Sequence, residues 1–583
     1  MENNIFKRYR ISSVFILCFF GFISVCAGQS PVLNLGFEHH KSNLQPFIWG
    51  FDQNNLNFTL VVDTTEAYSG KGSLSIKNNA SKSSFAVYNF LDKAIYKSHD
   101  KMSLSCYVKY KNITSGGAPK IYINEQGGIK KIYKISNELP VLEKGKQSDW
   151  TRITIEVEID TTMKRLMFGI IAFSGEVWFD NLAIELDGVL LADQSMPEYP
   201  SQTQFLWLNN YTSPLDTANN NTLKYTKKDL KKVEIIGLGE STHGTHEFFK
   251  TKASLIKELI RDFGFSVIAF ETPMAEAHEI NKFIIDGVGD LDEMMNNRYL
   301  FSINKNTEIK ELLLWLKNEN LSRSHKIHFE GVDMQKPTQA LKNIVNYFGE
   351  NKIIGIDVKI ISDFLSSNPN KAKYQEIKSR LTTIKEYINK NERDLNLDAF
   401  NLKWAKQNVE LLLQMSDENL FGRLYSKRDS LMAANLIFLK NLYTKDKVIF
   451  WAHNSHIQST NSIGTGTYLK KQFLDAYYSI GFATGEGNVR TFDSYGVSKV
   501  SRISKSYEGS IDFHLSSLNR NNYFLNLKKL NEKEPSYKKK LINQLNFRMM
   551  GFNEKITNYS EFHLTENFDA LIFIKNSTAT SLK

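Results

Sequence analysis

The sequence predicts a multidomain fold, in which an all-β sandwich is followed by an α/β domain with a mainly parallel sheet and a large helical insertion. Three observations lead to this prediction. At 583 residues, the chain is longer than one hydrophobic core usually serves. Residues 31–190 contain short segments in which apolar and polar residues alternate, and turns with glycine separate them. From Tyr225 onward, strand-like and helix-like runs alternate, which is typical of α/β domains.

The first 28 residues have the pattern of a secretory signal peptide. Three basic residues within the first ten precede an apolar run, residues 11–25, and the small residues Ala27 and Gly28 follow. We therefore expect cleavage near Ala27 or Gly28, and export to the periplasm, the outer surface or the medium. A lipid anchor on Cys26 is the weaker alternative, because Val25 stands where a lipidated cysteine prefers a small residue before it.

Charge and cysteine content exclude two classes of function. The formal net charge of +10 comes from dispersed lysines, and no zinc finger or RNA-recognition signature occurs, so nucleic acid is not an expected partner. Of the three cysteines, Cys18 and Cys26 lie in the leader and Cys106 stands alone in the mature chain. No disulfide framework and no cysteine-based metal site can be built from that number.

Residues 31–190 are predicted to form the β-sandwich. The short, regularly spaced segments are rich in Val, Ile, Tyr and Phe, which favours strands of a two-sheet sandwich. The strands are expected at residues 57–63, 73–77, 84–90, 102–110, 152–159 and 166–173.

Four segments of this region form a recognisable set: Asn34-Leu-Gly-Phe-Glu38, Tyr68-Ser-Gly-Lys-Gly-Ser-Leu74, Asp149-Trp-Thr151 and Gly175-Glu-Val-Trp-Phe-Asp-Asn-Leu182. With these segments the region resembles the jelly-roll family of carbohydrate-binding, galactose-binding-like domains. The resemblance implies a glycan as a partner of this domain. Trp49, Trp150 and Trp178 are the aromatic side chains that a sugar would stack on, although packing in the core is the preferred interpretation for each of them.

Residues 191–221 are predicted to be a linker. The segment is polar and contains three prolines, while Phe205-Leu-Trp-Leu208 is expected to dock on the second domain. Residues 222–583 are predicted to form that α/β domain.

Four apolar runs in the second domain share a polar cluster at the carboxyl end, where open α/β sheets bind ligands. The runs are Val233–Leu238, Phe265–Phe270, Ile327–Val332 and Val448–Trp451, and a final run, Ala570–Ile574, is predicted to be one more strand. Between the third and the fourth run, residues 338–443 are predominantly helical. That is too long for a crossover, so we expect a helical layer that covers the crevice.

His243 is the first candidate for catalysis. It follows the first of these strands and precedes Gly244, and a histidine is the natural general base near neutral pH. Glu240 precedes it by three residues, and Glu271 ends the second run, which we expect to be the neighbouring strand. One carboxylate would orient the imidazole, and the other would orient a water molecule or a substrate hydroxyl group.

Lys252 lies on the apolar face of the following helix, together with Phe248, Leu255 and Leu259. A charged group on that face needs a partner, and Glu240 or Glu271 would serve. Two functional interpretations are open: the lysine positions a carboxylate, or it stabilises oxyanion charge. Snorkelling to the edge of the helix is the structural alternative.

His453 and His456 follow the fourth strand within Trp451-Ala-His-Asn-Ser-His456. Either imidazole would serve as a proton donor to an oxyanion or a leaving group, and His453 is nearer to the strand end. Arg428, Met432 and Asn435 share one face of an earlier helix, where they line the crevice or pack the helical layer, so they are left out of the predicted site.

Other catalytic motifs are missing from the sequence. Gly239-Glu-Ser-Thr-His243 begins like a nucleophile elbow, but the second glycine is replaced by histidine. There is no P-loop, GxGxxG or HExxH motif. The histidines and glutamates named above are also a feasible metal-ligand set, and that alternative stays open.

Several separate motifs follow one another in the second domain: Glu240-Ser-Thr-His-Gly-Thr245, Glu247-Phe-Phe249, Ala269-Phe-Glu271, Gly331-Val-Asp-Met-Gln335, Arg428-Asp429 with Met432 and Asn435, and Trp451-Ala-His-Asn-Ser-His456. In this order they resemble the erythromycin esterase family over roughly residues 206–574. The resemblance implies that His243 is the general base, that Glu240 and Glu271 are its acidic partners, and that His453 is a second essential histidine, with His456 close by.

Two departures from the family pattern bear on the substrate. Lys252 stands where macrolide-inactivating members carry arginine, and it lacks the planar fork of that residue. The leader and the sandwich domain do not belong to the antibiotic-resistance enzymes, so the resemblance does not single out a macrolide.

The sequence therefore predicts an exported hydrolase that cleaves a carboxylic ester or a lactone without a cofactor. In this hypothesis His243 deprotonates a water molecule with the aid of Glu240 or Glu271, while Lys252 and His453 stabilise the tetrahedral oxyanion. A metal-dependent hydrolase with the same residues is one alternative. The other is a glycan-binding surface protein whose second domain is inactive.

Overall fold

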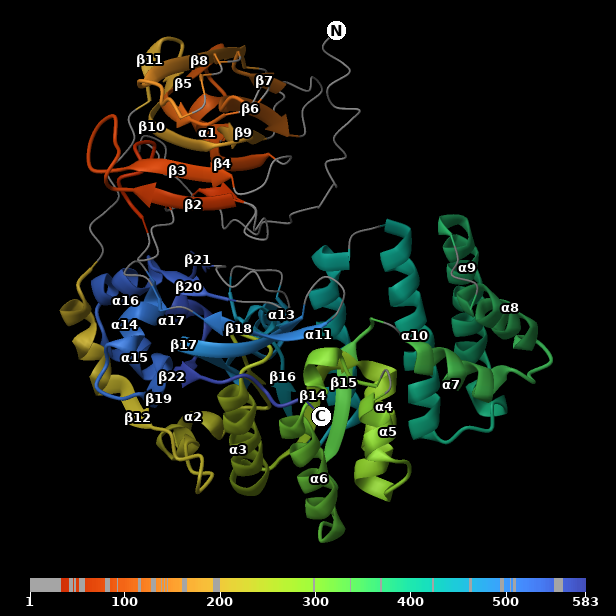
Figure 1. The fold of residues 1–583 in the computed structure, drawn as a ribbon. Coiled ribbons are helices and arrows are strands. Elements are labelled where there is room, and N and C mark those ends of the chain that lie inside the picture. Colours follow the sequence, from red (N-terminus) through yellow and green to blue (C-terminus); the bar gives the residue numbers. More distant parts are fainter. Residues whose placement is uncertain are drawn as a thin grey trace. The chain divides into compact units, whose positions relative to one another are not determined.

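A computed structural model describes residues 33–582, apart from 41–45, 47–48, 52–57, 79–83, 92, 114–116, 127–132, 138, 141, 144, 160–164, 192–199, 297–298, 336, 367–369, 422–423, 461–463, 493–496, 504, 507–509 and 550–558. The chain divides into two compact units, Met1–Tyr199 and Pro200–Lys583 (Figure 1). The predicted signal peptide and Cys26 lie outside the described residues. Within the described part, no helix is both long and apolar enough to cross a membrane.

The first unit contains two antiparallel sheets that share one apolar core. The sheet orders are β1-β4-β9-β6-β7 and β2-β3-β10-β5-β8, and β11 pairs with β10. The elements are β1 (Gly50–Phe51), β2 (Phe58–Asp63), β3 (Ser73–Asn78), β4 (Phe85–Leu91), α1 (Lys93–Tyr96), β5 (Lys101–Lys111), β6 (Lys120–Gln126), β7 (Tyr133–Ile135), β8 (Thr151–Glu158), β9 (Arg165–Ala172), β10 (Glu176–Leu186) and β11 (Val189–Leu190). Each of the six strands expected from the sequence corresponds to one of these strands.

Alternation along the strands explains why the first unit folds as a sandwich. In β2 and β8 every second residue is buried, so each strand presents one apolar face to the core and one polar face to solvent. Trp49 and Trp178 are buried and Trp150 is half-buried, so of the three tryptophans named above only Trp150 is partly exposed. Cys106 is buried as a free thiol in the same core.

The second unit is built on a nine-stranded sheet. Its order is β12-β19-β22-β17-β13-β16-β14-β15, and β18 pairs with β17. The segment β22-β17-β13-β16-β14-β15 is parallel throughout. The strands are β12 (Thr212–Pro214), β13 (Ile235–Leu238), β14 (Phe265–Pro273), β15 (His328–Asp333), β16 (Lys447–Trp451), β17 (Tyr477–Phe492), β18 (Ser498–Ile503), β19 (Asn522–Asn526) and β22 (Ala570–Ser577), and a separate ribbon joins β20 (Asn546–Arg548) to β21 (Tyr559–Glu561).

The strand order corrects one expectation. We expected the strands that end near Glu240 and Glu271 to be neighbours, but β16 lies between β13 and β14 and pairs with both. The carboxyl end of β16 carries His453 and His456, so this insertion places the histidines between the two glutamates in the sheet. Because β13 and β16 are far apart in the sequence, the sequence alone does not show that they are neighbours in the sheet.

Helices cover both faces of the sheet, and successive strand residues point to opposite sides. Ile235 packs in one core with the inserted helices α7–α11, and Ile236 packs in the other core with α3, α4 and α6. The helices are α2 (Lys227–Leu230), α3 (His246–Phe263), α4 (Met274–Asp286), α5 (Leu291–Asn296), α6 (Thr307–Leu321), α7 (Thr338–Phe348), α8 (Gly355–Ser366), α9 (Lys371–Lys390), α10 (Ala399–Phe421), α11 (Leu424–Leu442), α12 (Asn454–Ile457), α13 (Thr465–Phe473), α14 (Ile511–Ser516), α15 (Leu527–Lys533), α16 (Ser536–Asn543) and α17 (Leu564–Asn567). The inserted helices α7–α11 occupy the place between β15 and β16 where a helical layer is expected.

Part of the segment expected to be a linker belongs to the second unit. Residues 202–211 form the 3-10 helix η2 (Gln202–Tyr211), and Phe205 and Leu208 are buried in the core of the second unit. The chain then enters the edge strand β12, while residues 192–199 lie outside the described part.

Candidate functional site

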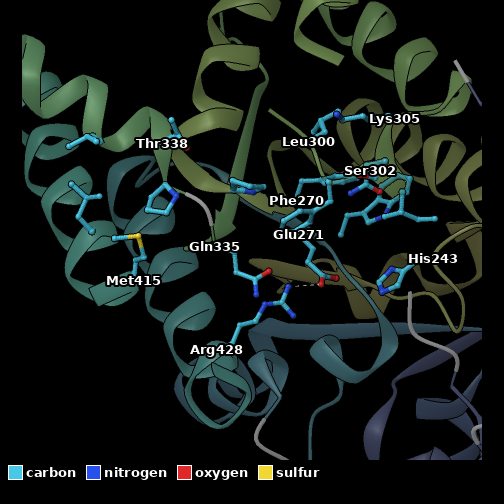
Figure 2. Close-up of a pocket in the computed structure, with 18 of the residues that line it drawn as sticks. His243, Phe270, Glu271, Leu300, Ser302, Lys305, Gln335, Thr338, Met415 and Arg428 are labelled. Atoms are coloured by element: carbon cyan, nitrogen blue, oxygen red, sulfur yellow. Dashed lines mark hydrogen bonds and ion pairs between the residues drawn. The ribbon is translucent and has the colours of Figure 1, made fainter. Parts of the chain in front are cut away.

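A cavity of about 920 Å³ lies in the second unit at the carboxyl ends of the parallel strands (Figure 2). Glu240, His243, Glu271 and Arg428 form its polar end. The strand order brings the first three of these residues together, because β13, β16 and β14 are adjacent and the backbone nitrogen of Asn454 donates to the Glu240 carbonyl oxygen at 2.9 Å. Arg428 comes from the inserted helix α11. The cavity is therefore at the edge of the sheet where the sequence predicts the site.

Glu240 and His243 form a hydrogen-bonded pair. The Nδ1 atom of His243 lies 2.7 Å from Oε1 of Glu240, and the imidazole is 17% exposed. Burial opposes the charged form of Glu240, but the ammonium group of Lys252 and the hydrogen bond from His243 outweigh it and hold the pKa of Glu240 below its ordinary value. An ionised carboxylate only accepts, so the proton is on Nδ1 and the lone pair of His243 is on Nε2. His243 is thus oriented as a base at the wall of the cavity.

Lys252 is fully buried behind Glu240. Its Nζ atom donates to Oε2 of Glu240 and lies 4.1 Å from the centroid of the Trp451 ring, whose Nε1 donates to the same oxygen at 3.2 Å. Burial lowers the pKa of Lys252 to about 8, against the opposing effect of Glu240. Lys252 does not line the cavity. Of the interpretations drawn from the sequence, positioning of a carboxylate fits this geometry, whereas contact with an oxyanion and snorkelling to the helix edge do not.

Glu271 is held by three groups. Its Oε2 atom accepts from the backbone nitrogen of His453 at 2.9 Å, and its Oε1 atom accepts from Nη2 of Arg428 at 2.9 Å and lies 3.3 Å from Nε2 of His456. Burial disfavours its charge, yet His456 and Arg428 hold the pKa of Glu271 well below its ordinary value. Figure 2 shows Arg428 reaching this carboxylate, with His243 beyond it across the cavity.

Arg428 connects the inserted helices to the sheet. It lies on α11 and donates from Nε, at 3.0 Å, and from Nη2, at 2.5 Å, to Oδ2 of Asp333 at the end of β15. Despite burial, the carboxylates of Asp333 and Glu271 raise the pKa of Arg428. The guanidinium group is therefore a permanent buried cation that also lines the cavity.

His456 lies between two carboxylates. Its Nδ1 atom is 2.7 Å from Oδ1 of Asp429, and its Nε2 atom faces Glu271. Burial opposes its charge, but Glu271 and Asp429 raise the pKa of His456 to about 10, so it is an imidazolium ion at neutral pH. A protonated Nε2 cannot accept from Nη1 of Arg428, although these two atoms are 3.2 Å apart. The Nη1 hydrogens of Arg428 are thus not taken up by His456.

His453 is neutral. Burial, together with the nearby His243 and His456, lowers the pKa of His453 to about 3. The backbone nitrogen of Ser455 donates to its Nδ1 at 3.2 Å, so the proton of this imidazole is on Nε2. Its ring centroid lies 4.8 Å from that of His243. His453 is therefore a buried N–H donor next to the base.

The structure brings all six predicted residues, His243, Glu240, Glu271, His453, Lys252 and His456, into one connected group. Arg428 was left out of the predicted site although its helical face was noted, and Asp429 and Asp333 appeared only as members of motifs, without a role. The signal for Arg428 was a charged residue on a face otherwise made of Met432 and Asn435, which are both buried.

Ser241 is not placed as a nucleophile. Its side chain is fully buried, it does not line the cavity, and its Oγ atom has no hydrogen-bond partner among the residues that the structure describes. Among these residues there is also no group of three or more His, Cys, Asp and Glu side chains arranged to hold a metal ion.

The remaining wall of the cavity is largely apolar. One side is formed by the segment 300–305 before α6, and the other by side chains of the inserted helices, including Leu341, Leu365, Tyr374, Leu412 and Met415. The cavity thus combines a charged end at the sheet with a broad apolar wall that comes from α7 to α10.

The second unit is similar in sequence to known proteins. The profile of the erythromycin esterase family matches residues 260–577. The erythromycin esterase type II of Escherichia coli is 25% identical over 412 residues, which cover 62% of this chain and 94% of that protein. YbfO of Bacillus subtilis (strain 168), whose name assigns it provisionally to the hydrolases, is 24% identical over 424 residues, which cover 64% of this chain and 90% of that protein.

A solved structure shares the fold of the second unit. The crystal structure of a Bacillus cereus protein aligns with a TM-score of 0.59 and 23% identity, and the alignment covers 66% of this chain and the whole of that chain. At this identity the likeness concerns the fold alone. The first unit lies outside the range of the family profile.

Proposed function

This chain belongs to the erythromycin esterase family, and from that premise we propose that it hydrolyses a carboxylic ester or a lactone with a water molecule that His243 deprotonates. The observation that carries the proposal is the His243–Glu240 pair at the cavity wall, with the lone pair of His243 on Nε2. Membership of the family by itself assigns the protein to the hydrolases that act on ester bonds. The roles of the residues and the use of a water molecule are our proposal.

The first step is proton transfer from water to His243. The ionised Glu240 accepts the Nδ1 proton and stabilises the imidazolium ion that forms, which makes Nε2 the better base. The hydroxide equivalent attacks the carbonyl carbon, and the C=O electron pair moves to oxygen to give a tetrahedral oxyanion. A positioned base contributes a factor of about 10²–10⁴ to the rate.

The oxyanion is stabilised by donors that are already in place. Arg428 lines the cavity and its guanidinium group is always charged, so we assign it the principal role. His453 carries its proton on Nε2 beside His243 but does not line the cavity, so we assign it a place next to the base and not contact with the oxyanion. When the intermediate collapses, the carbon–oxygen bond to the alcohol breaks, and His243 returns its proton to the leaving alkoxide.

The proposed role of Lys252 gives a pH test. In Lys252→Met, Glu240 remains buried without its cation, so burial should raise the pKa of Glu240. The wild-type Glu240 stays ionised to lower pH, and therefore the acid limb of kcat/KM should move to higher pH in the variant. At any pH below the new limb, kcat/KM should fall about tenfold for each unit by which the raised pKa exceeds that pH. The profile is measured on a p-nitrophenyl ester between pH 5 and 9.

Lys252→Arg is the matched control. Arginine keeps a cation next to Glu240, so the acid limb should stay near that of the wild type. An unmoved acid limb in Lys252→Met would show that Lys252 does not control the ionisation of Glu240.

Hydrolysis of esters by the purified protein tests the proposed function. We expect turnover of at least one member of a panel of p-nitrophenyl esters with two- to twelve-carbon acyl chains, acetylated xylan and the lactone erythromycin A. The broad apolar wall favours substrates with a large apolar part over acetate esters. A panel with no turnover above the background rate would refute the proposal.

Removal of metal ions with chelators tests the metal-dependent alternative. Apart from the lone pair on Nε2 of His243, the atoms of the site that could bind a metal ion already have partners: Nδ1 of His453 accepts a backbone proton, and Glu240 and Glu271 each bind cationic side chains. We therefore expect turnover to be unchanged after dialysis against 1,10-phenanthroline and EDTA. A loss that a divalent metal restores would favour the alternative.

Two further roles are proposed outside the cavity. Export through the N-terminal leader is supported by its sequence pattern, and sequencing of the mature N-terminus near Ala27 tests it.

Glycan binding by the first unit is supported by the aromatic group of Tyr68, stacked on Tyr107 at 3.5 Å between ring centroids, and Trp150. The test is binding of the full-length chain to a glycan array. If Trp150→Ala binds the same glycans as the wild type, these aromatic side chains are not the binding site.

A further inference from the structure

The segment 578–582, which we call the C-terminal clasp, pairs with the loop that carries His243. The backbone nitrogen of Thr580 donates to the Gly244 carbonyl oxygen at 3.0 Å, and the backbone nitrogen of His246 donates to the Thr578 carbonyl oxygen at 2.9 Å. Thr245 and Ala579 form an antiparallel bridge between these bonds. The clasp therefore continues the chain beyond β22 as a short extended partner of the catalytic loop.

The same segment also holds the start of α6, which follows the wall of the cavity formed by residues 300–305. The backbone nitrogen of Thr307 donates to the Ser581 carbonyl oxygen at 3.2 Å, and Asn306 forms an antiparallel bridge with Leu582. The backbone nitrogen of Ser581 donates to Glu308 at 3.2 Å. The clasp thus connects two segments that border the cavity and are far apart in sequence, as the position of the C-terminus beside α3 and α6 shows (Figure 1).

Side chains anchor the clasp at its other end. The carboxylate of Glu247 accepts from the backbone nitrogen of Thr578 at 2.8 Å and from its hydroxyl group at 2.6 Å. Arg490 on β17 donates from Nε, at 3.1 Å, and from Nη2, at 2.8 Å, to the Thr580 carbonyl oxygen. Thr580 is buried, so this carbonyl group is held in a place shielded from solvent.

Arg490 also contacts the catalytic loop directly. Its backbone nitrogen donates to the Gly244 carbonyl oxygen at 2.9 Å, so this oxygen accepts from both Arg490 and Thr580. A Cβ atom at Gly244 would lie 2.1 Å from the Arg490 carbonyl oxygen, so only glycine permits this close approach. The residue after His243 is therefore fixed from two sides.

We propose that the C-terminal clasp, residues 578–582, positions His243 for base catalysis, and that Arg490 is the positioning residue that holds the clasp against the catalytic loop. This inference rests on the proposed function of His243. The clasp lies beyond residue 577, where the match to the family profile ends. A displacement of about 1 Å at a catalytic group can lower a rate by about 10²-fold, so backbone bonds of this kind suffice to control the rate.

The test is a double-mutant cycle on kcat with two changes, Arg490→Met and removal of residues 578–583. Each change should lower kcat about 10- to 100-fold on the fastest p-nitrophenyl ester, with KM within about threefold of the wild type. Because both act through one contact, the combined variant should be no slower than the truncated chain alone. Arg490→Lys, which can still donate one hydrogen bond to Thr580, should recover part of the rate.

Two controls separate positioning from a general loss of structure. Arg502→Met removes an exposed arginine from the neighbouring strand β18 and should leave kcat and the unfolding temperature unchanged. Thr578→Val removes only the hydroxyl bond to Glu247 and serves if the truncated chain does not fold. It should lower kcat by a smaller factor.

The imidazole NMR signal of His243, assigned by its loss in His243→Ala, gives a readout that does not depend on turnover. It should shift in Arg490→Met and not in Arg502→Met. An active wild type whose kcat and His243 signal are both unchanged by Arg490→Met and by the truncation would overturn the role of the clasp. A wild type without esterase activity, but with a His243 signal that shifts as expected, would refute the proposed function alone.

Discussion

His243→Ala is expected to lower kcat by about 10²–10⁴-fold, the range that a positioned general base contributes. KM should change little, because His243 is one of many residues that line the cavity. Stability should also change little, since Glu240 keeps its bonds to Lys252 and Trp451 when the imidazole is removed. The measurement is steady-state hydrolysis of the fastest p-nitrophenyl ester, together with thermal unfolding.

Rescue of His243→Ala by free imidazole is a second test of the role of His243. The substitution leaves a space at the wall of the cavity, so free imidazole should restore part of the rate in His243→Ala and have little effect on the wild type. The matched control is His325→Ala, because the side chain of His325 is 66% exposed and lies outside the cavity. Full activity of His243→Ala without imidazole would remove His243 from the mechanism.

Arg428→Met is expected to have the largest combined effect on stability and rate. It removes the buried cation between Glu271 and Asp333, which leaves two carboxylates without their shared partner. Breaking a buried pair in this way typically costs about 3–5 kcal/mol of unfolding free energy. The loss of an oxyanion donor should lower kcat by about 10²–10³-fold. Chemical denaturation and steady-state kinetics give the two quantities.

The control for this prediction is Arg261→Met. Arg261 is 48% exposed and pairs with Glu319 on the surface, so its removal should cost about 0–1 kcal/mol and leave kcat unchanged. Arg428→Lys keeps the charge but cannot bind both carboxylates in the same geometry, and its rate should lie between those of the wild type and Arg428→Met. Equal stability of Arg428→Met and Arg261→Met would contradict the proposed bridging role.

The fold was predictable where local pattern decides it. Alternation of apolar residues is strong in β2 and β8, and continuous apolar runs mark β14 and β16, because parallel strands are covered on both faces. The central strand β17 was missed because glycines interrupt its apolar pattern. Gly481 is required there by tertiary packing, since a Cβ atom would lie 2.5 Å from the ring of Phe568, a contact that no local pattern shows.

The candidate site was predictable to the extent that polar residues follow strands. His243, Glu271 and His453 all stand at carboxyl ends of parallel strands, and this position is visible in the sequence. The roles of Arg428 and Lys252 depend on distances across the fold. Both are cations on mainly apolar helix faces, and only the structure shows that Lys252 is enclosed behind Glu240 while Arg428 reaches the cavity.

The central claim is that the site activates a water molecule for direct attack on the ester. A single turnover in water labelled with ¹⁸O, stopped by rapid quenching and followed by intact-protein mass spectrometry, tests it most directly. We predict that each acid molecule released in the first turnover carries one ¹⁸O atom and that the mass of the protein stays unchanged throughout. An acyl group attached to the protein during turnover, or unlabelled acid with ¹⁸O in a glutamate of the site, would contradict the claim.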